Sequence, residues 1–218
     1  MFGQILYTQV KWTRNVLTVL SIVAFALPAG LWRITHYSYF GNATAMEVLR
    51  GFEVLGPSLV ILAFFSGFMA VAQPWAIDAS ARHVYPLSLP VAWPRYVGMR
   101  FGAGALLTLI PTLALWLGCM LVLSLVTIPA TLHAYPGTLA LRFLLGTLLS
   151  YAGIFAVQYI AGRKAAHLLL VVVLIVAVLA LASELTGNGK VLLRVLNLLF
   201  KSPGPLAVFG ETWMLIDV

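Results

Sequence analysis

Charged residues are scarce in this chain of 218 residues. Asp, Glu, Lys and Arg together make up 9% of it, whereas 62% of the residues are hydrophobic. A soluble domain is roughly 45–50% apolar and about 25% charged. An ordinary soluble domain is therefore excluded, and the composition predicts an all-α polytopic membrane protein.

Cysteine and the motifs of common catalytic sites are also missing. Cys119 is the only cysteine, which excludes an internal disulfide, a CxxC redox pair and a cysteine-based zinc or iron–sulfur site. The chain has no GxxxxGK[ST] loop, no HExxH and no GxSxG, and its six carboxylates and four histidines are scattered mostly across loop ends. We expect no enzyme, metal site or cofactor on this chain, so an ATP-driven activity needs a partner that binds the nucleotide.

Positive charge exceeds negative charge, with a net value of +7. In a soluble protein this excess would point to nucleic acid. In a membrane protein, basic residues flank the spans and meet anionic headgroups. We therefore expect membrane lipids, and no nucleic acid, as partners of these residues.

Apolar runs predict the membrane spans. They cover residues 16–32, 54–77, 101–128, 139–162 and 168–183. The first run also resembles a signal peptide, because Ala24-Phe25-Ala26 imitates a cleavage site.

The two ends of the chain carry amphipathic patterns. Residues 1–15 place apolar side chains on one helical stripe before Lys11 and Arg14, which predicts an interfacial helix; a plain basic flank is the alternative. Residues 190–218 begin with a polar stripe on a leucine-rich helix too short to span, and are predicted to be interfacial or re-entrant.

A polar loop separates the second and third spans. Residues 78–100 read DASARHVYPLSLPVAWPRYVGMR, with a proline at every fourth position from Pro86 to Pro94. Each proline disfavours a helical conformation at the residue before it. The pattern predicts a short helix over about 76–85, a kinked segment and a new helix beginning near Pro94.

This loop resembles a known family. Leu87-Ser88-Leu89-Pro90-Val91, followed by a basic residue and a long apolar helix, resembles the first cytoplasmic loop of ABC-2-type (type V) exporter permeases. In that family the loop carries a coupling helix that sits in a groove of the ATP-binding subunit. The family usually has a Gly-Thr pair and a second acid before the leucine run, where this chain has Ala81-Arg82 and the single acid Asp78.

The resemblance implies five to six transmembrane helices and a short cytoplasmic coupling helix. It implies a dimeric permease subunit, homo- or heterodimeric, with ATP and Mg²⁺ on a separate ATP-binding subunit docked at residues 76–93. The docking residues would be Asp78, Arg82, His83, Tyr85, Leu87, Leu89 and Pro90. The uncharged spans favour an apolar or amphipathic substrate. A non-transporting scaffold subunit of a larger membrane complex is the alternative.

Lys and Arg near the span ends predict the orientation. With the N-terminus inside, seven lie on the inner side and six on the outer side, and three of those six belong to the C-terminal segment. We therefore expect a multi-pass protein of a prokaryotic cytoplasmic membrane with its N-terminus inside.

Three polar or helix-breaking residues of the second span are candidates for a path or gate. Pro57 frees a backbone carbonyl and Gln73 needs partners in hydrocarbon, so both favour a position facing the bundle or a cavity. Glu53 lies near the external mouth, where it is either a gate residue or an interfacial carboxylate that balances Arg50. Ionisable groups are nearly absent from the span centres, which disfavours a proton- or sodium-driven transporter.

Overall fold

The computed structural model is mostly helical. It describes residues 1–38, 45–80, 92–125 and 133–161, with residues 198, 200, 201, 204, 206–210, 213 and 216–217 nearer the C-terminus. The chain forms two compact units, one of residues 1–152 with 212–218 and the other of residues 153–211.

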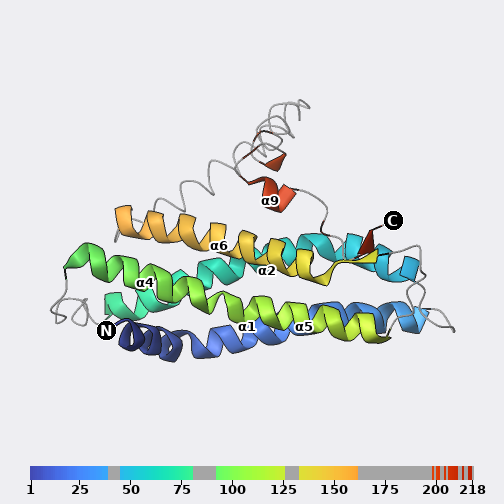
Figure 1. Ribbon diagram of the computed structural model, residues 1–218, viewed down its shortest axis with the longest axis horizontal. Coiled ribbons are helices and arrows are strands. Elements are labelled where there is room, and N and C mark those ends of the chain that lie inside the picture. Colours follow the sequence, from blue (N-terminus) through green and yellow to red (C-terminus); the bar gives the residue numbers. More distant parts are fainter. Residues whose placement is uncertain are drawn as a thin grey trace. The chain divides into compact units, whose positions relative to one another are not determined.

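Long antiparallel helices build the first unit. Their bounds are α1 Phe2–Ser38, α2 Ala45–Ser80, α4 Trp93–Leu107, α5 Leu109–Leu125 and α6 Pro136–Ala161, of which α6 belongs to this unit up to Ala152. The N-terminus lies at the end where α4 begins, and the C-terminus lies at the end where α6 begins (Figure 1).

Four helical stretches are long and apolar enough to cross a membrane within the described residues. They are Phe2–Gly30, Gly56–Asp78, Trp93–Leu125 and Pro136–Ile160. They correspond to the first four predicted spans, and they indicate a membrane-embedded protein. The predicted fifth span, residues 168–183, lies outside the described residues.

α1 is one continuous helix through residues 15 and 16, where an interfacial helix was predicted to end and a span to begin. A single stripe of α1 is buried, at Ile5, Gln9, Thr13, Leu17, Leu20, Ala24 and Pro28. Steps of three and four residues keep these side chains on one helical face. The two predicted elements therefore present one face to the bundle, and the interfacial helix is not a separate element.

The third span begins at Trp93, earlier than the predicted residue 101. Pro94 occupies the first turn of α4. The N–H groups of the first turn have no acceptor within the helix, so the N–H that proline lacks costs no helical hydrogen bond. The N–H groups of Arg95 and Tyr96 bond to the Ala92 carbonyl at 3.0 and 3.1 Å. The prediction that a helix begins near Pro94 is therefore confirmed.

The third span is interrupted at Thr108, between α4 and α5. Pro111 has no N–H to offer the carbonyl of Leu107, four residues earlier. The Thr108 hydroxyl donates to the Ala105 carbonyl at 2.6 Å, and the Thr112 hydroxyl donates to the Thr108 carbonyl at 2.9 Å. Two side-chain hydroxyls thus bond to backbone carbonyls before and at the interruption.

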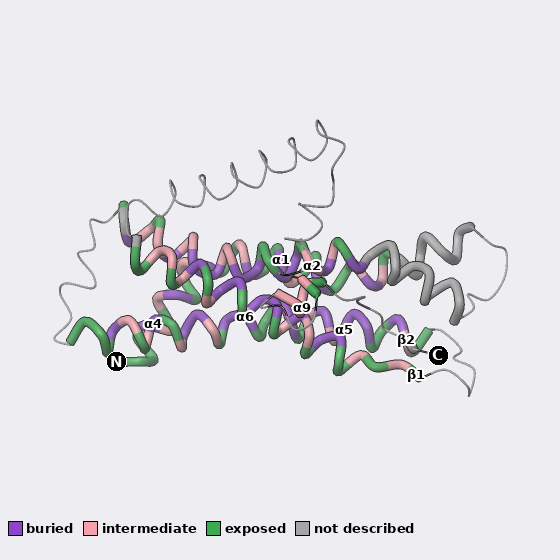
Figure 2. Tube along the Cα trace, turned by 90° about the horizontal axis from the view of Figure 1, so that it is seen from above, coloured by how far each residue is buried: buried purple, intermediate pink, exposed green. Residues whose placement is uncertain are grey.

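α2 and α6 approach each other closely at Gly67. A Cβ atom at this position would lie 2.5 Å from the carbonyl oxygen of Thr147 and 2.7 Å from Cβ of Ser150. Only glycine permits this backbone approach, as expected for small residues at helix contacts in membranes. Buried and exposed positions alternate along each helix (Figure 2), and α1 packs along α2 and α5.

A pair of two-residue strands joins residues near the C-terminus to the segment that precedes α6. β1 (His133–Ala134) pairs antiparallel with β2 (Ile216–Asp217), with His133 opposite Asp217 and Ala134 opposite Ile216. The second unit contains the end of α6 and the short helix α9 (Ala207–Gly210). Most of the predicted interfacial segment 190–218 lies outside the described residues.

Candidate functional site

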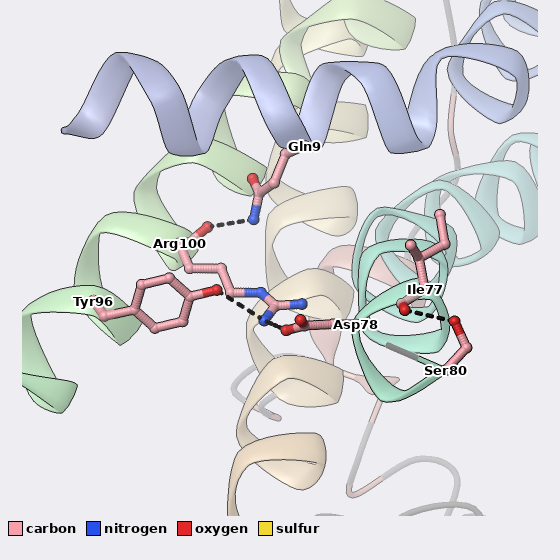
Figure 3. A network of polar contacts seen from close by, with 6 residues as sticks. All are labelled: Gln9, Ile77, Asp78, Ser80, Tyr96 and Arg100. Atoms are coloured by element: carbon pink, nitrogen blue, oxygen red, sulfur yellow. Dashed lines mark hydrogen bonds and ion pairs between the residues drawn. The ribbon is translucent and has the colours of Figure 1, made fainter. Parts of the chain in front are cut away.

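A buried ion pair joins α2 to α4. Nη1 of Arg100 donates to Oδ2 of Asp78 at 2.5 Å, and the two side chains are 8% and 0% exposed (Figure 3). A charge-assisted hydrogen bond this short is among the stronger polar contacts in proteins. Removing one partner would leave the other charge buried, so the pair fixes the two helix ends relative to each other.

Aromatic groups surround the guanidinium of Arg100. Nη1 also donates to the Tyr96 hydroxyl at 3.3 Å, one turn earlier on α4. The Arg100 Cζ atom lies 5.5 Å from the ring centroid of Trp75 on α2, which is within the range of a cation–π contact. The indole thus adds a second contact between the guanidinium and α2.

The backbone beside Arg100 receives hydrogen bonds from two further helices. Nε2 of Gln9, on α1, donates to the Arg100 carbonyl at 3.1 Å (Figure 3). The hydroxyl of Tyr151, on α6, donates to the Phe101 carbonyl at 3.0 Å and lies 3.4 Å from that of Arg100. Residues 100 and 101 are therefore contacted from α1, α2 and α6.

Gly104 makes room for the Tyr151 phenol. A Cβ atom at Gly104 would overlap the hydroxyl and ring of Tyr151. The ring of Tyr151 also packs against that of Phe101, with centroids 5.2 Å apart. A side chain at residue 104 would displace the phenol and remove the contact between α6 and this part of α4.

Two buried polar atoms lie close to the ion pair. Oε1 of Gln9 and Nη2 of Arg100 are buried and have no hydrogen-bond partner among the residues that the structure describes. In Figure 3 the two atoms point in different directions. They do not converge on a common point. The cluster of polar and aromatic residues around Arg100 is therefore suited to joining helices and not to enclosing a ligand.

The cluster lies close to one end of the helices. Asp78 is two residues from the end of α2 and Arg100 is seven residues from the start of α4. The Ser80 hydroxyl donates to the Ile77 carbonyl at 2.7 Å, which satisfies a carbonyl in the last turn of α2 (Figure 3). The ion pair therefore ties together the two helices that flank residues 81–91.

Only one of the predicted docking residues falls within the described part of the chain. That residue, Asp78, is fully buried against Arg100 and does not present its carboxylate on the surface. The docking role of Asp78 stays a prediction, and its carboxylate contacts Arg100 inside the bundle. Six docking residues lie outside the described residues: Arg82, His83, Tyr85, Leu87, Leu89 and Pro90.

The predicted gate residues are not brought together with this cluster. Pro57 is exposed on α2, and its neighbour Gly56 is the buried residue at this level of the helix. Gln73 is half-buried. Glu53 belongs to the helix α2, but its side chain is outside the described part of the structure.

Sequence reasoning missed the partners of Arg100. Gln9 and Tyr151 come from α1 and α6, which are distant from Arg100 in sequence. Tyr96 lies one helical turn before Arg100 on α4, a spacing that the sequence does offer. One signal was present: an acid ends one apolar run and a base starts the next, which places opposite charges at neighbouring helix ends. Within the described ranges, no group of three or more His, Cys, Asp or Glu residues is arranged to hold a metal ion.

The chain matches no protein-family model, no curated protein and no solved structure.

Proposed function

We propose that this protein is the membrane permease subunit of an ATP-driven ABC exporter, and that a separate ATP-binding subunit docks at residues 76–93. The observation that carries the proposal is the Asp78–Arg100 ion pair. It ties together the two helices that enter and leave the proposed docking loop. A loop anchored in this way transmits a displacement to the helices instead of absorbing it.

The mechanism is mechanical. Closure of the ATP-binding subunits moves the loop, and α2 and α4 follow together because Asp78 and Arg100 link them. Gln9 and Tyr151 extend the link to α1 and α6 through the carbonyls of residues 100 and 101. A push on one loop thereby reaches every long helix of the first unit.

The distribution of charge supports an external energy source. Residues 15–32, 56–77, 101–125 and 143–161 contain no Asp, Glu, Lys or Arg. Ion-driven transporters keep ionisable side chains near the middle of the membrane. In this proposal ATP and Mg²⁺ bind to the partner subunit, and the substrate is apolar or amphipathic.

The assembly that we propose contains two permease subunits, identical or different, in the cytoplasmic membrane of a prokaryote. The N-terminus and the docking loop face the cytoplasm. The exposed basic residues Lys11, Arg14 and Arg95 lie on helices at the end where α4 begins. Their position agrees with the excess of positive charge expected on the cytoplasmic side of membrane proteins.

Co-purification tests the proposal. The tagged chain is isolated from native membranes in mild detergent and its partners are identified by mass spectrometry. A nucleotide-binding ATPase in near-equal amount is expected. Tyr85→Asp with Leu87→Asp should abolish its recovery while membrane insertion stays intact, because two carboxylates would enter an apolar contact.

The matched control is Tyr135→Asp with Gly137→Asp, which adds the same charge at exposed positions at the other end of the unit. This pair should leave ATPase recovery unchanged. Unchanged recovery with the loop pair would overturn the docking role. A set of other membrane proteins without an ATPase would instead make the scaffold function the leading one.

A further inference from the structure

The first turns of α1 cross α4 instead of running along it. A Cβ atom added to Gly102 would lie 3.8 Å from Cε2 of Phe2. Nε2 of Gln9 donates to the Arg100 carbonyl at 3.1 Å (Figure 3). Phe2 and Gln9 are seven residues apart, which corresponds to about 10 Å along a helix. Because both meet α4 at nearly the same level, the start of α1 lies across α4 close to Arg100.

Further along, α1 runs beside the third span. A Cβ atom added to Gly118 of α5 would lie 2.5 Å from the carbonyl oxygen of Phe25. Gln9 and Phe25 are 16 residues apart, and the residues that they meet, Arg100 and Gly118, are 18 residues apart. The two helices therefore advance together over this stretch. α1 thus has a start that lies across α4 and a longer part that follows the third span.

The crossing lies at one boundary of the membrane. On each of three helices, one charged residue adjoins the uncharged stretch: Arg14 on α1, Asp78 on α2 and Arg100 on α4. A charged side chain costs free energy in hydrocarbon, so these residues mark where the hydrocarbon begins. Asp78 and Arg100 are in contact, and α1 crosses α4 at their level. The start of α1 therefore lies in the interface between hydrocarbon and headgroups.

An apolar flank fixes how this part of α1 is turned about its own axis. Ile5 and Gln9 are buried and face the bundle. Beside them, Phe2, Leu6 and Val10 follow at steps of four on one flank of the helix, where Phe2 and Val10 are exposed and Leu6 is half-buried. The apolar face of an interfacial helix enters the outer part of the hydrocarbon. The side of α1 away from the bundle then lies among the headgroups.

That side carries polar residues, which we call the α1 outer stripe. They follow at steps of three and four and are all exposed: Gln4, Tyr7, Lys11 and Arg14. Asp78 is the one carboxylate among the side chains that the structure describes, and it is buried against Arg100. The stripe therefore presents an ammonium, a guanidinium, an amide and a phenol, without a carboxylate of its own.

We propose that the α1 outer stripe binds the headgroups of anionic phospholipids at the membrane face where α4 begins. Its four residues all donate hydrogen bonds, two of them with a positive charge, and a phosphate group accepts such bonds. The occupant is a lipid because the apolar flank holds the stripe at the depth of the headgroups. The proposal goes beyond the exporter function and does not depend on it, since lipid binding is measured on the purified chain without an ATPase.

Lipid-dependent thermal unfolding tests the proposal. The full chain in mild detergent is heated with a thiol-reactive dye, and Cys119, the only cysteine and 1% exposed, reports unfolding. Phosphatidylglycerol is titrated as the anionic lipid and phosphatidylcholine as the neutral one. Phosphatidylglycerol should raise the Tm by roughly 5–10 °C at about a hundredfold excess over its dissociation constant, because it binds the folded state. Equal shifts with both lipids would overturn the proposal.

The key variant is Lys11→Gln with Arg14→Gln. A basic residue near an anionic surface contributes about fivefold to affinity, so the half-saturating concentration of phosphatidylglycerol should rise by about 30-fold. The Tm in phosphatidylcholine should stay unchanged, because both side chains are exposed.

The matched control is Arg95→Gln with Lys201→Gln, which removes one arginine and one lysine from exposed positions outside the stripe. This pair should raise the half-saturating concentration by at most about fivefold. The same shift with both pairs would mean that net charge, and not the α1 outer stripe, attracts the lipid, and would overturn the proposal.

Two other occupants of the stripe are distinguished by further measurements. Inorganic phosphate at the same concentration should leave the Tm unchanged; a rise equal to that with phosphatidylglycerol would assign the stripe to a soluble anion. The variant Lys11→Gln with Arg14→Gln should retain any ATPase that co-purifies with the parent chain from native membranes. If it loses the ATPase while its affinity for phosphatidylglycerol is unchanged, the stripe is a protein contact and the lipid proposal is wrong.

Discussion

The two ends of the helical unit hold their helices together by different means. At Arg100 the contacts are an ion pair and hydrogen bonds between residues of the helices themselves. At Trp213 an aromatic side chain from a separate segment lies between two helices. Separating the helices at the first end uncovers a buried charge, whereas at the second end it uncovers a buried aromatic side chain. One end therefore depends on the pairing of charges and the other on aromatic packing.

The largest effect is expected from breaking the ion pair on one side. Arg100→Leu leaves the fully buried Asp78 without its cation and should lower the free energy of unfolding by about 3–5 kcal/mol. Titration with SDS in mixed micelles, followed by tryptophan fluorescence, measures this change.

The double variant Asp78→Leu with Arg100→Leu separates the loss of the Asp78–Arg100 attraction from the burial of a carboxylate that has lost this cation. Replacing both members of a buried pair by apolar residues is often close to neutral, so most of the lost stability should return. A double variant as unstable as Arg100→Leu would mean that the pair itself, and not the buried carboxylate of Asp78, accounts for the loss.

An intermediate effect is expected at the α2–α6 contact, which lies between the two ends. Gly67→Ala places a methyl group against the carbonyl oxygen of Thr147 and should destabilise the unit by about 1–3 kcal/mol, as overpacking does. Gly30→Ala, with no atom near its added Cβ, should be neutral or stabilising by about 0.5–1 kcal/mol. Equal behaviour of the two variants would contradict the close approach.

The smallest effect is expected at Gln9. Gln9→Leu removes one hydrogen bond to the Arg100 carbonyl together with the buried Oε1 atom that has no partner within the described ranges. The net loss should be at most about 1.5 kcal/mol in the same SDS titration. Gln4→Leu, at an exposed position of the same helix, should change stability by less than about 0.5 kcal/mol. A loss at Gln9 as large as that of Arg100→Leu would place the rigid contact on α1 instead of the ion pair.

Apolar runs sufficed to predict the helices but not where they begin and end. Residues 54–77 and 139–162 correspond to Gly56–Asp78 and Pro136–Ile160, because a run of apolar residues sets the length that fits a bilayer. The break predicted after residue 15 was wrong as a helix end, since Lys11 and Arg14 lie on the exposed side of α1 while its buried stripe continues past them. Lys11 and Arg14 therefore do not mark the end of a helix.

The site was less accessible to sequence reasoning than the fold. The loop 78–100 was recognised as a special stretch, yet Asp78 was expected only as a docking residue and its pairing with Arg100 was not predicted. Their pairing depends on how α2 and α4 lie side by side, and Gln9 and Tyr151 join only through the packing of α1 and α6. Trp213 is similar, because its contacts with Gly56 and Phe143 connect segments separated by most of the chain.

The interruption at Thr108 bears on how the third span enters the membrane. A hydroxyl inside a span needs a hydrogen-bond acceptor, and in hydrocarbon there is no water to provide one. Here the hydroxyls of Thr108 and Thr112 donate to the carbonyls of Ala105 and Thr108, at most four positions away in the same stretch. These bonds need no neighbouring helix. The stretch Trp93–Leu125 can therefore carry both hydroxyls into the bilayer with their donors already satisfied, before any helix of the bundle has assembled around it.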